Sequence, residues 1–200
     1  MCKVNRIIKV VCEGRSESAY LNQINRFLKE NSIKIIFSPV STDGGHFNVI
    51  KKKLQELGYL KKKTAYQNRE LIIWVDKDVY ERNEQKNKDK YEDFIQKYPL
   101  LTFCFNRFSF EDFYILHFDA ETVIKWYDLC RKKGHFNVPI ESKVCENLIL
   151  GIVSNYEKGD ISSEFINKDS LKNLLENNKK YEFESGIVDI LKPILNTILC

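Results

Sequence analysis

Short apolar runs alternate with amphipathic stretches through the first half of the chain. Strand-like runs occupy residues 7–14, 33–40, 71–78 and 100–105, and helical periodicity covers 16–30 and 46–63. Within 16–30, Tyr20, Ile24 and Phe27 fall on one face, and Ser16 is placed to cap the helix. Strands that alternate with helices in this way predict a largely parallel sheet flanked by helices.

The pattern becomes helical after residue 106. Helices are expected at 109–118, 120–132, 140–155, 170–178 and 186–199. Pro193 is expected to interrupt the last of these, because proline cannot donate the helical hydrogen bond. The charged stretch 81–90 contains no apolar residue and is typical of a loop or of a solvated helix start. We therefore expect an α/β core over residues 1–106 and a helical C-terminal extension over 107–200, packed on that core.

The composition agrees with a folded globular protein. Of the 200 residues, 43% are hydrophobic and 30% are charged, which argues against disorder. The formal net charge of +4 permits a polyanionic partner but does not identify one. The six cysteines form no C-x-x-C pair, a usage typical of reduced thiols. No signal-peptide pattern and no apolar run of bilayer length is found, so we expect a cytoplasmic protein without a membrane partner.

Two of the strand-like runs end in carboxylates. Glu13 follows the first run, and Asp76 and Asp78 end the third. The carboxyl ends of parallel strands meet at one edge of a sheet, so these acids would gather there. Because two unit charges about 4 Å apart repel by about 4 kcal/mol near a protein surface, a divalent cation with oxygen ligands is expected among them, Mg2+ first and Mn2+ as the alternative. The competing interpretation is that such acids cap helices or turns.

Three motifs in the chain resemble those of the RloB family. They are the Cys-Glu-Gly opening within residues 11–20, the Asp-x-Asp strand end at 75–78, and a Phe-Glu followed by aromatic residues and His-Phe within 109–118. The resemblance implies a Toprim-like fold, in which Glu13 serves as acid/base or metal ligand while Asp76 and Asp78 hold Mg2+. It also implies a nuclease associated with restriction and anti-phage defence.

The chain departs from the family pattern at three places. Ser16 replaces the usual threonine, no proline follows Glu17, and residues 106–109 stand where an Asn-Pro normally precedes the Phe-Glu motif. These differences leave the identity of the substrate more open than the fold.

Glu111 and His117 lie in the third motif, and each has two interpretations. On a helix they are six positions apart and do not share a face. Glu111 is either a fourth metal ligand or one half of a structural ion pair with a residue such as Arg107. His117 is either a core residue or a contact to the substrate, as a proton donor or a phosphate ligand.

Several cations are candidates for contact with a substrate. Lys77 and Arg15 each lie within two positions of a proposed acid, so either could meet a scissile phosphate. We assign Lys77 to the catalytic group and Arg15 to substrate binding. A lysine-rich segment that includes Lys51, Lys52 and Lys62 would follow a nucleic-acid backbone, although lysine runs are also typical of solvated helix faces.

The function predicted from the sequence is Mg2+-dependent hydrolysis of phosphodiester bonds in DNA or RNA, in anti-phage defence. Nucleic acid is the expected partner, and the helical half would suit a partner ATPase, another defence subunit or a second copy of the chain. One alternative is a non-catalytic nucleic-acid or nucleotide sensor with a metal-bridged phosphate site. Another is phosphoryl transfer to a small nucleotide or to an acceptor aspartate, although the sequence has no P-loop and no G-x-G-x-x-G.

Overall fold

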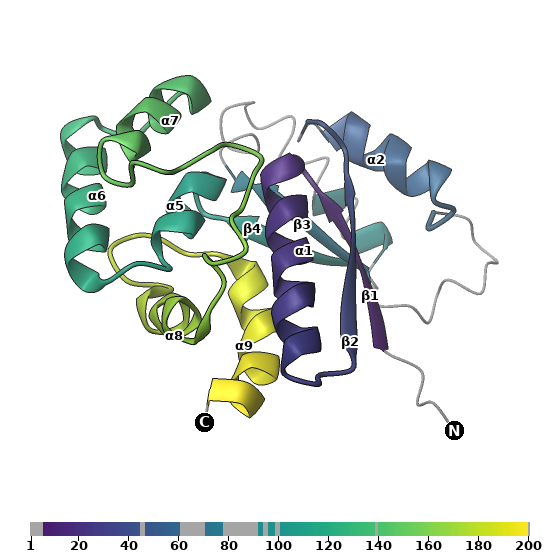
Figure 1. Cartoon of the computed structure of the whole chain (residues 1–200). Coiled ribbons are helices and arrows are strands. Elements are labelled where there is room, and N and C mark those ends of the chain that lie inside the picture. Colours follow the sequence, from purple (N-terminus) through teal and green to yellow (C-terminus); the bar gives the residue numbers. More distant parts are fainter. Residues whose placement is uncertain are drawn as a thin grey trace. The chain divides into compact units, whose positions relative to one another are not determined.

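The computed structural model describes residues 6–44, 47–60, 71–77, 92–93, 96–98, 101–138 and 140–199 (Figure 1). The chain divides into two compact units. The first, called the sheet unit, comprises Met1–Val75 and Val79–Cys104, and the second, called the helical unit, comprises Asp76–Asp78 and Phe105–Cys200. A boundary between independent domains at 106/107 stays a prediction. The charged stretch 81–90 lies outside the described residues.

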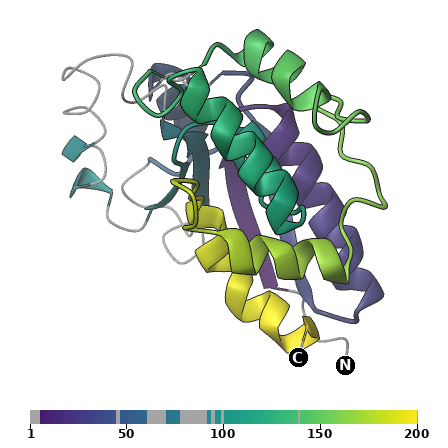
Figure 2. The ribbon, with the colours of Figure 1, turned by 90° about the vertical axis from the view of Figure 1, so that its left-hand side faces the viewer.

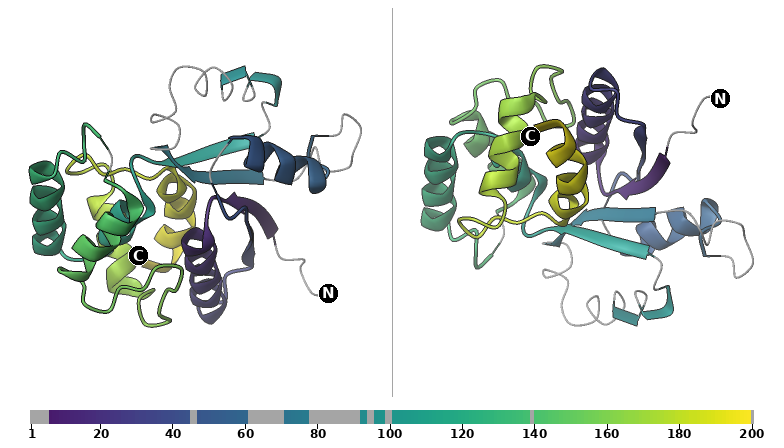
Figure 3. Two further views of the ribbon diagram at one scale, coloured as in Figure 1. Left: turned by 90° about the horizontal axis from the view of Figure 1, so that it is seen from above. Right: turned by 90° about the horizontal axis from the view of Figure 1, so that it is seen from below.

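A four-stranded parallel sheet confirms the predicted α/β fold. Its strands are β1 (Arg6–Cys12), β2 (Ile35–Ser41), β3 (Leu71–Asp76) and β4 (Leu101–Asn106), in the order β2-β1-β3-β4. At the end of β1, Cys12 pairs with Ser41 of β2 on one side and with Trp74 of β3 on the other. Figure 3 shows β3 and β4 side by side. Each strand falls within a run that the hydrophobic pattern predicted.

Helix α1 (Arg15–Glu30) begins one turn earlier than its expected cap would place it. The N-cap is Gly14, whose N–H donates to the Glu17 carboxylate at 3.1 Å, so Ser16 lies inside the first turn and not at the cap. The helix buries an apolar face against β1 and β2 that consists of Tyr20, Leu21, Ile24, Phe27 and Leu28. Tyr20 meets the ring of Trp74 edge-on, with centroids 5.8 Å apart.

The strand order places a topological switch point between β1 and β3, because the chain leaves β1 toward β2 and then crosses back to β3. Glu13 is the first residue beyond β1 at that point. Its N–H donates to the carbonyl of Trp74 at 3.0 Å, and its own carbonyl accepts from the N–H of Gly44 at 2.9 Å and from the Thr42 hydroxyl at 3.0 Å. The backbone of Glu13 is therefore held at the position where open parallel sheets bind ligands.

Helix α2 (Phe47–Glu56) is shorter than the expected 46–63. It ends in a Schellman motif, in which the N–H of Tyr59 reaches the carbonyl of Leu54 and the N–H of Gly58 reaches that of Gln55, both at 3.0 Å. Gly58 has a φ of 79°, a left-handed conformation that glycine adopts without strain. The lysine pattern continued past residue 57, but the glycine ended the helix.

The helical unit contains five helices among its described residues. They are α5 (Phe110–Ile115), α6 (Ala120–Lys132), α7 (Ser142–Leu150), α8 (Lys168–Asn177) and α9 (Gly186–Leu199). Figure 2 looks onto α6 and α8, which pack together, and α8 also packs on α9. The largest side chains in their shared core include Phe113, Trp126 and Phe183, each at most 1% exposed.

Helix α9 runs through Pro193, so the expected interruption there is wrong. A proline removes one helical hydrogen bond, but Leu191, Ile194 and Leu195 around it are all buried, and their packing holds the helix together. Although α9 is strongly apolar, no helix in the described part of the chain has the combination of length and hydropathy that a bilayer crossing requires.

The outer strand β2 is partly covered by a side chain of α1. Asn25 donates its amide N–H to the carbonyl of Phe37 at 2.6 Å and accepts from the N–H of Phe37 at 2.7 Å. One side chain thus satisfies both backbone groups that Phe37 turns away from the sheet, where an unpaired strand edge would otherwise be left open.

Replacing Asn25 by alanine should therefore destabilise the protein by about 1–2 kcal/mol, because a partly buried backbone donor and acceptor both lose their partner. Urea unfolding measures this loss. Arg26→Ala is the matched control on the same helix, since it removes only an exposed pair with Glu30 and should change stability by no more than about 0.5 kcal/mol. Equal effects of the two substitutions would contradict the edge-covering role of Asn25.

Candidate functional site

Asp76 at the end of β3 is oriented by two donors within the helical unit. Its Oδ1 accepts from the amide of Asn106 at 2.7 Å, and its Oδ2 accepts from the N–H of Phe110 at 3.2 Å. Asn106 is itself fixed, because it is 1% exposed and its carbonyl oxygen accepts from the Ser185 hydroxyl at 2.6 Å. Carboxylates held in this way by hydrogen bonds to surrounding groups are typical of metal ligands.

Glu111 is buried next to a lysine that the sequence did not single out. Its carboxylate is 4% exposed, and Oε1 accepts from the hydroxyl of Tyr156 at 3.2 Å and lies 3.4 Å from Nζ of Lys158. The expected partner Arg107 is wrong, since Arg107 pairs with Glu182 at 2.7 Å. The structural ion pair considered for Glu111 therefore exists, but with a cation from a distant segment.

The charge on Lys158 links Glu111 to Asp76. Burial alone would lower the pKa of the Lys158 ammonium, but the charges of Glu111, Glu146 and Asp76 outweigh it and raise that pKa. Burial, together with the charge of Glu111, also raises the pKa of the Tyr156 hydroxyl, which stays a donor at neutral pH. The helical unit thus brings Asp76, Glu111 and Lys158 into one electrostatic cluster, called the Lys158 cluster below.

The remaining predicted site residues are dispersed. Glu13 lies in the sheet unit with a half-buried side chain, and its meeting with Asp76 around one cation stays a prediction. Arg15 is 83% exposed and lies 3.5 Å from Asp43. Lys77 is half-buried. Lys51 and Lys52 are exposed on α2, whereas Asp78 and Lys62 lie outside the described residues.

His117 is a core residue in this fold. It is 2% exposed, its Nδ1 lies 3.2 Å from the carbonyl of Tyr114, and its ring packs against Phe113 and Phe165 at centroid distances of 5.1 and 4.9 Å. Burial lowers its pKa to about 3, against smaller opposing effects of backbone hydrogen bonds. The ring is therefore neutral at pH 7, and its position gives no support to the predicted substrate contact.

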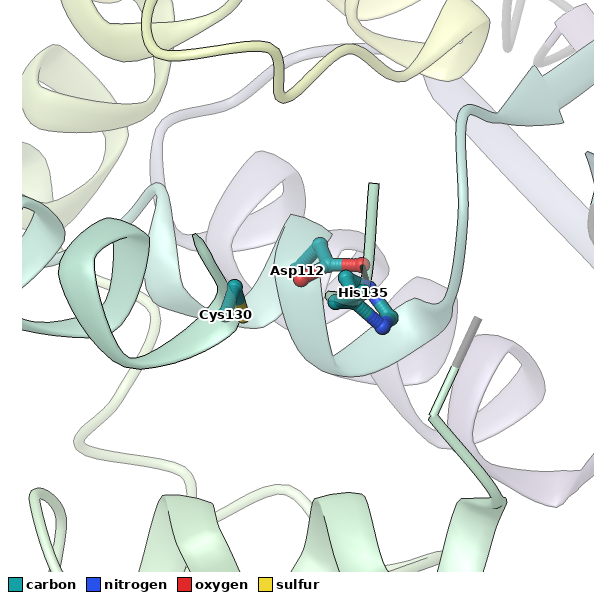
Figure 4. A group of neighbouring side chains, drawn as sticks. All are labelled: Asp112, Cys130 and His135. Atoms are coloured by element: carbon teal, nitrogen blue, oxygen red, sulfur yellow. Dashed lines mark hydrogen bonds and ion pairs between the residues drawn. The ribbon is translucent and has the colours of Figure 1, made fainter. Parts of the chain in front are cut away.

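Next to Glu111, Asp112 is the centre of a second buried network (Figure 4). Its Oδ1 accepts from the indole N–H of Trp126 at 2.7 Å. Its Oδ2 accepts from both the N–H and the hydroxyl of Ser109 at 3.1 Å and lies 2.9 Å from Nε2 of His135. In Figure 4 the Asp112 carboxylate and the His135 ring point toward each other, with Cys130 nearby.

Asp112, Cys130 and His135 offer ligand atoms within 4.8 Å of one another, the spacing of a metal site. The hydrogen bonds argue against one. Nδ1 of His135 accepts from the N–H of Ile140 at 2.9 Å, so the ring proton lies on Nε2 and points at Asp112, which leaves neither nitrogen free to bind a metal. Burial, and then the charge of Asp112, raise the pKa of the Cys130 thiol, whereas a metal needs the thiolate.

The comparisons with known proteins were made against families, curated proteins and solved structures. The family model described as RloB-like protein matches residues 8–186. The chain belongs to the RloB-like family. No curated protein and no solved structure matches it. The matched region includes Glu13, Asp76, Glu111 and Lys158, so all described members of the candidate site lie within the family's shared part.

Sequence reasoning missed four residues that shape these sites in this RloB-like protein: Asn106, Asp112, Tyr156 and Lys158. Asp112 carried a signal, because an acid between Phe110 and Phe113 in an apolar helix needs buried donors. Lys158 carried none, since a lysine before a glycine in a polar stretch is typical of an exposed turn.

Asp112→Asn should destabilise this RloB-like protein by about 3 kcal/mol, because an amide turns a donor toward groups that already donate. Urea unfolding measures the loss, with the exposed Asp128→Asn on α6 as the control. The purified protein should contain no stoichiometric zinc by elemental analysis, and EDTA should leave its melting temperature unchanged. A zinc-dependent melting temperature would show that the network is a metal site after all.

His117 should make stability fall with acid. Between its ordinary pKa of 6.5 and about 3, the unfolded chain binds a proton that the folded chain does not, so stability rises with pH across that window. Lowering the pH from about 7 to about 5 should cost the wild type about 2 kcal/mol more than His117→Asn, whose neutral amide can still donate to Tyr114. Unfolding curves at both pH values test this, and equal losses would contradict the buried neutral ring.

Proposed function

We propose that this RloB-like protein is a divalent-metal-dependent nuclease that hydrolyses phosphodiester bonds in DNA or RNA, with a role in anti-phage defence. Glu13, Asp76 and Asp78 would hold Mg2+ or Mn2+, with Glu111 as a further ligand. The observation that carries the proposal is the state of Asp76: a carboxylate at the end of a buried strand, fixed by Asn106 and Phe110 and sharing the field of Lys158 with Glu111.

The carboxylates of the Lys158 cluster fit a hard cation. Each oxygen of Asp76 accepts one of the hydrogen bonds described above, which leaves a lone pair on each for a metal. Among the described residues, the hydrogen bonds and ion pairs of Glu111 all go to Oε1, so the buried Oε2 remains as an acceptor. Carboxylate oxygens of this kind are the usual ligands of Mg2+ and Mn2+.

A bound divalent cation would supply Lewis-acid activation of water and neutralisation of charge on the phosphoryl group. The chain's own residues would do the rest. Asn106 and the N–H of Phe110 keep the carboxylate of Asp76 in one orientation. Glu13, held by backbone bonds at the switch point of the sheet, would act as acid/base or metal ligand.

Cations outside the acid cluster would hold the nucleic acid. Lys77 and Arg15 adjoin the acids in sequence and would orient the scissile phosphate. Lys51 and Lys52 are exposed on α2 and would follow the phosphate backbone. Binding would then weaken with added salt, because each neutralised phosphate releases counterions.

Glu13→Gln and Asp76→Asn should each lower hydrolysis of labelled DNA and RNA in Mg2+ or Mn2+ by about a thousandfold or more, since both remove charge from the proposed metal ligands. The control is Glu30→Gln, an exposed acid on α1 paired with Arg26, which should hydrolyse at the wild-type rate. Circular dichroism checks that each variant is folded. Unchanged activity in the first two variants would remove these residues from the chemistry, and saturable binding without turnover in the wild type would favour the non-catalytic sensor.

A further inference from the structure

Lys158 occupies an unusual position for a surface lysine. It lies in a tight turn between Glu157 and Asp160, closed by the N–H of Asp160 donating to the carbonyl of Glu157 at 3.2 Å. Gly159 supplies the left-handed residue of the turn, with a φ of 84°. The turn is anchored on both sides, because Tyr156 is 5% exposed and Ile161 is 2% exposed. The lysine is therefore held at a defined place and is not on a loose loop.

The two ends of the Lys158 ion pair differ in their access to water. The side chain of Lys158 is 42% exposed, whereas that of Glu111 is 4% exposed. The ammonium thus stands between a buried carboxylate and solvent. Since its charge also interacts with Asp76 and Glu146, it neutralises in part the same acids that the proposed function assigns to a metal.

Two cations cannot both be closest to the same carboxylates. A divalent ion carries twice the charge of an ammonium and would take the inner position on Glu111 and Asp76. The lysine stem is flexible and half-exposed, so its ammonium has room to turn to the solvent side. There it would lie where a phosphate bound to the metal must approach.

Resting on the proposed function, we infer that Lys158 is a tethered cation that competes with the divalent metal for Glu111 and Asp76 and, once displaced, donates to a phosphate oxygen of the nucleic acid. Lys158 therefore has opposite effects on the two ligands: it weakens metal binding and strengthens binding of the phosphate. A lysine whose role is only to stabilise the fold would not produce this opposition.

The experiment compares the full chain as wild type, Lys158→Met and Lys125→Met. Lys125 lies 2.7 Å from Glu121 in an exposed pair on α6, so its removal makes the same change in charge away from the cluster. Electron paramagnetic resonance of Mn2+ measures metal affinity. Lys158→Met should bind Mn2+ about tenfold more tightly than the wild type, while Lys125→Met should match the wild type. Equal or weaker Mn2+ binding by Lys158→Met overturns the inference, as does a wild type that binds no Mn2+.

Fluorescence anisotropy with a labelled oligonucleotide in saturating Ca2+ measures the second effect. Lys158→Met should bind the oligonucleotide about tenfold more weakly than the wild type, whereas Lys158→Arg, which keeps the charge, should stay within about twofold of it. Unchanged oligonucleotide binding by Lys158→Met overturns the phosphate contact. If Lys158→Met does not fold, Lys158→Gln replaces it, because the glutamine amide can still donate to Glu111 without a charge.

These readouts separate the inference from the proposed function. A wild type that hydrolyses no nucleic acid but shows both effects of Lys158 would refute the nuclease and keep the tethered cation. Hydrolysis by the wild type, with Mn2+ and oligonucleotide affinities unchanged in Lys158→Met, would keep the nuclease and remove Lys158 from its site.

Discussion

Burial of carboxylates around α5 is the constraint on which the helical unit depends. Asp76 accepts from the first N–H of this helix, and Glu111 and Asp112 follow in its first turn, each 3% exposed. An ionised group taken out of water costs several kcal/mol unless donors surround it. Donors come from four separate segments of the unit: Asn106, Trp126, His135 and the turn that carries Tyr156 and Lys158. The acids of α5 thus hold distant parts of the unit together.

The two acids of α5 solve the same problem in different ways. Asp112 accepts four hydrogen bonds from neutral donors and is closed off from water, so nothing remains for it to bind. Glu111 depends instead on a hydroxyl and on the charge of a half-exposed lysine. A mobile cation can be exchanged for another cation, whereas a set of fixed neutral donors cannot. This difference is why the Lys158 cluster, and not the Asp112 network, is the candidate for metal chemistry.

The sheet supplies a separate constraint. Its order β2-β1-β3-β4 leaves the ends of β1 and β3 adjacent at the switch point, with Glu13 bonded through its backbone to Trp74. The loop after β2 is tied to the same place by Thr42, which donates its N–H to the carbonyl of Cys12 and its hydroxyl to that of Glu13. Family membership over residues 8–186 agrees with a shared architecture that keeps this position in register.

The sequence by itself determined the α/β class, the four strands and most of the helices, because periodicity and turn residues are local properties of the chain. It also pointed to Glu13 and Asp76, since an acid directly after a buried run is visible without a fold. Only the tertiary structure decided that Lys158 and not Arg107 pairs with Glu111, that Asn106 orients Asp76, and that His117 is a neutral core residue. Those outcomes depend on contacts between segments about 30 to 50 positions apart and on burial, and neither is encoded in local spacing.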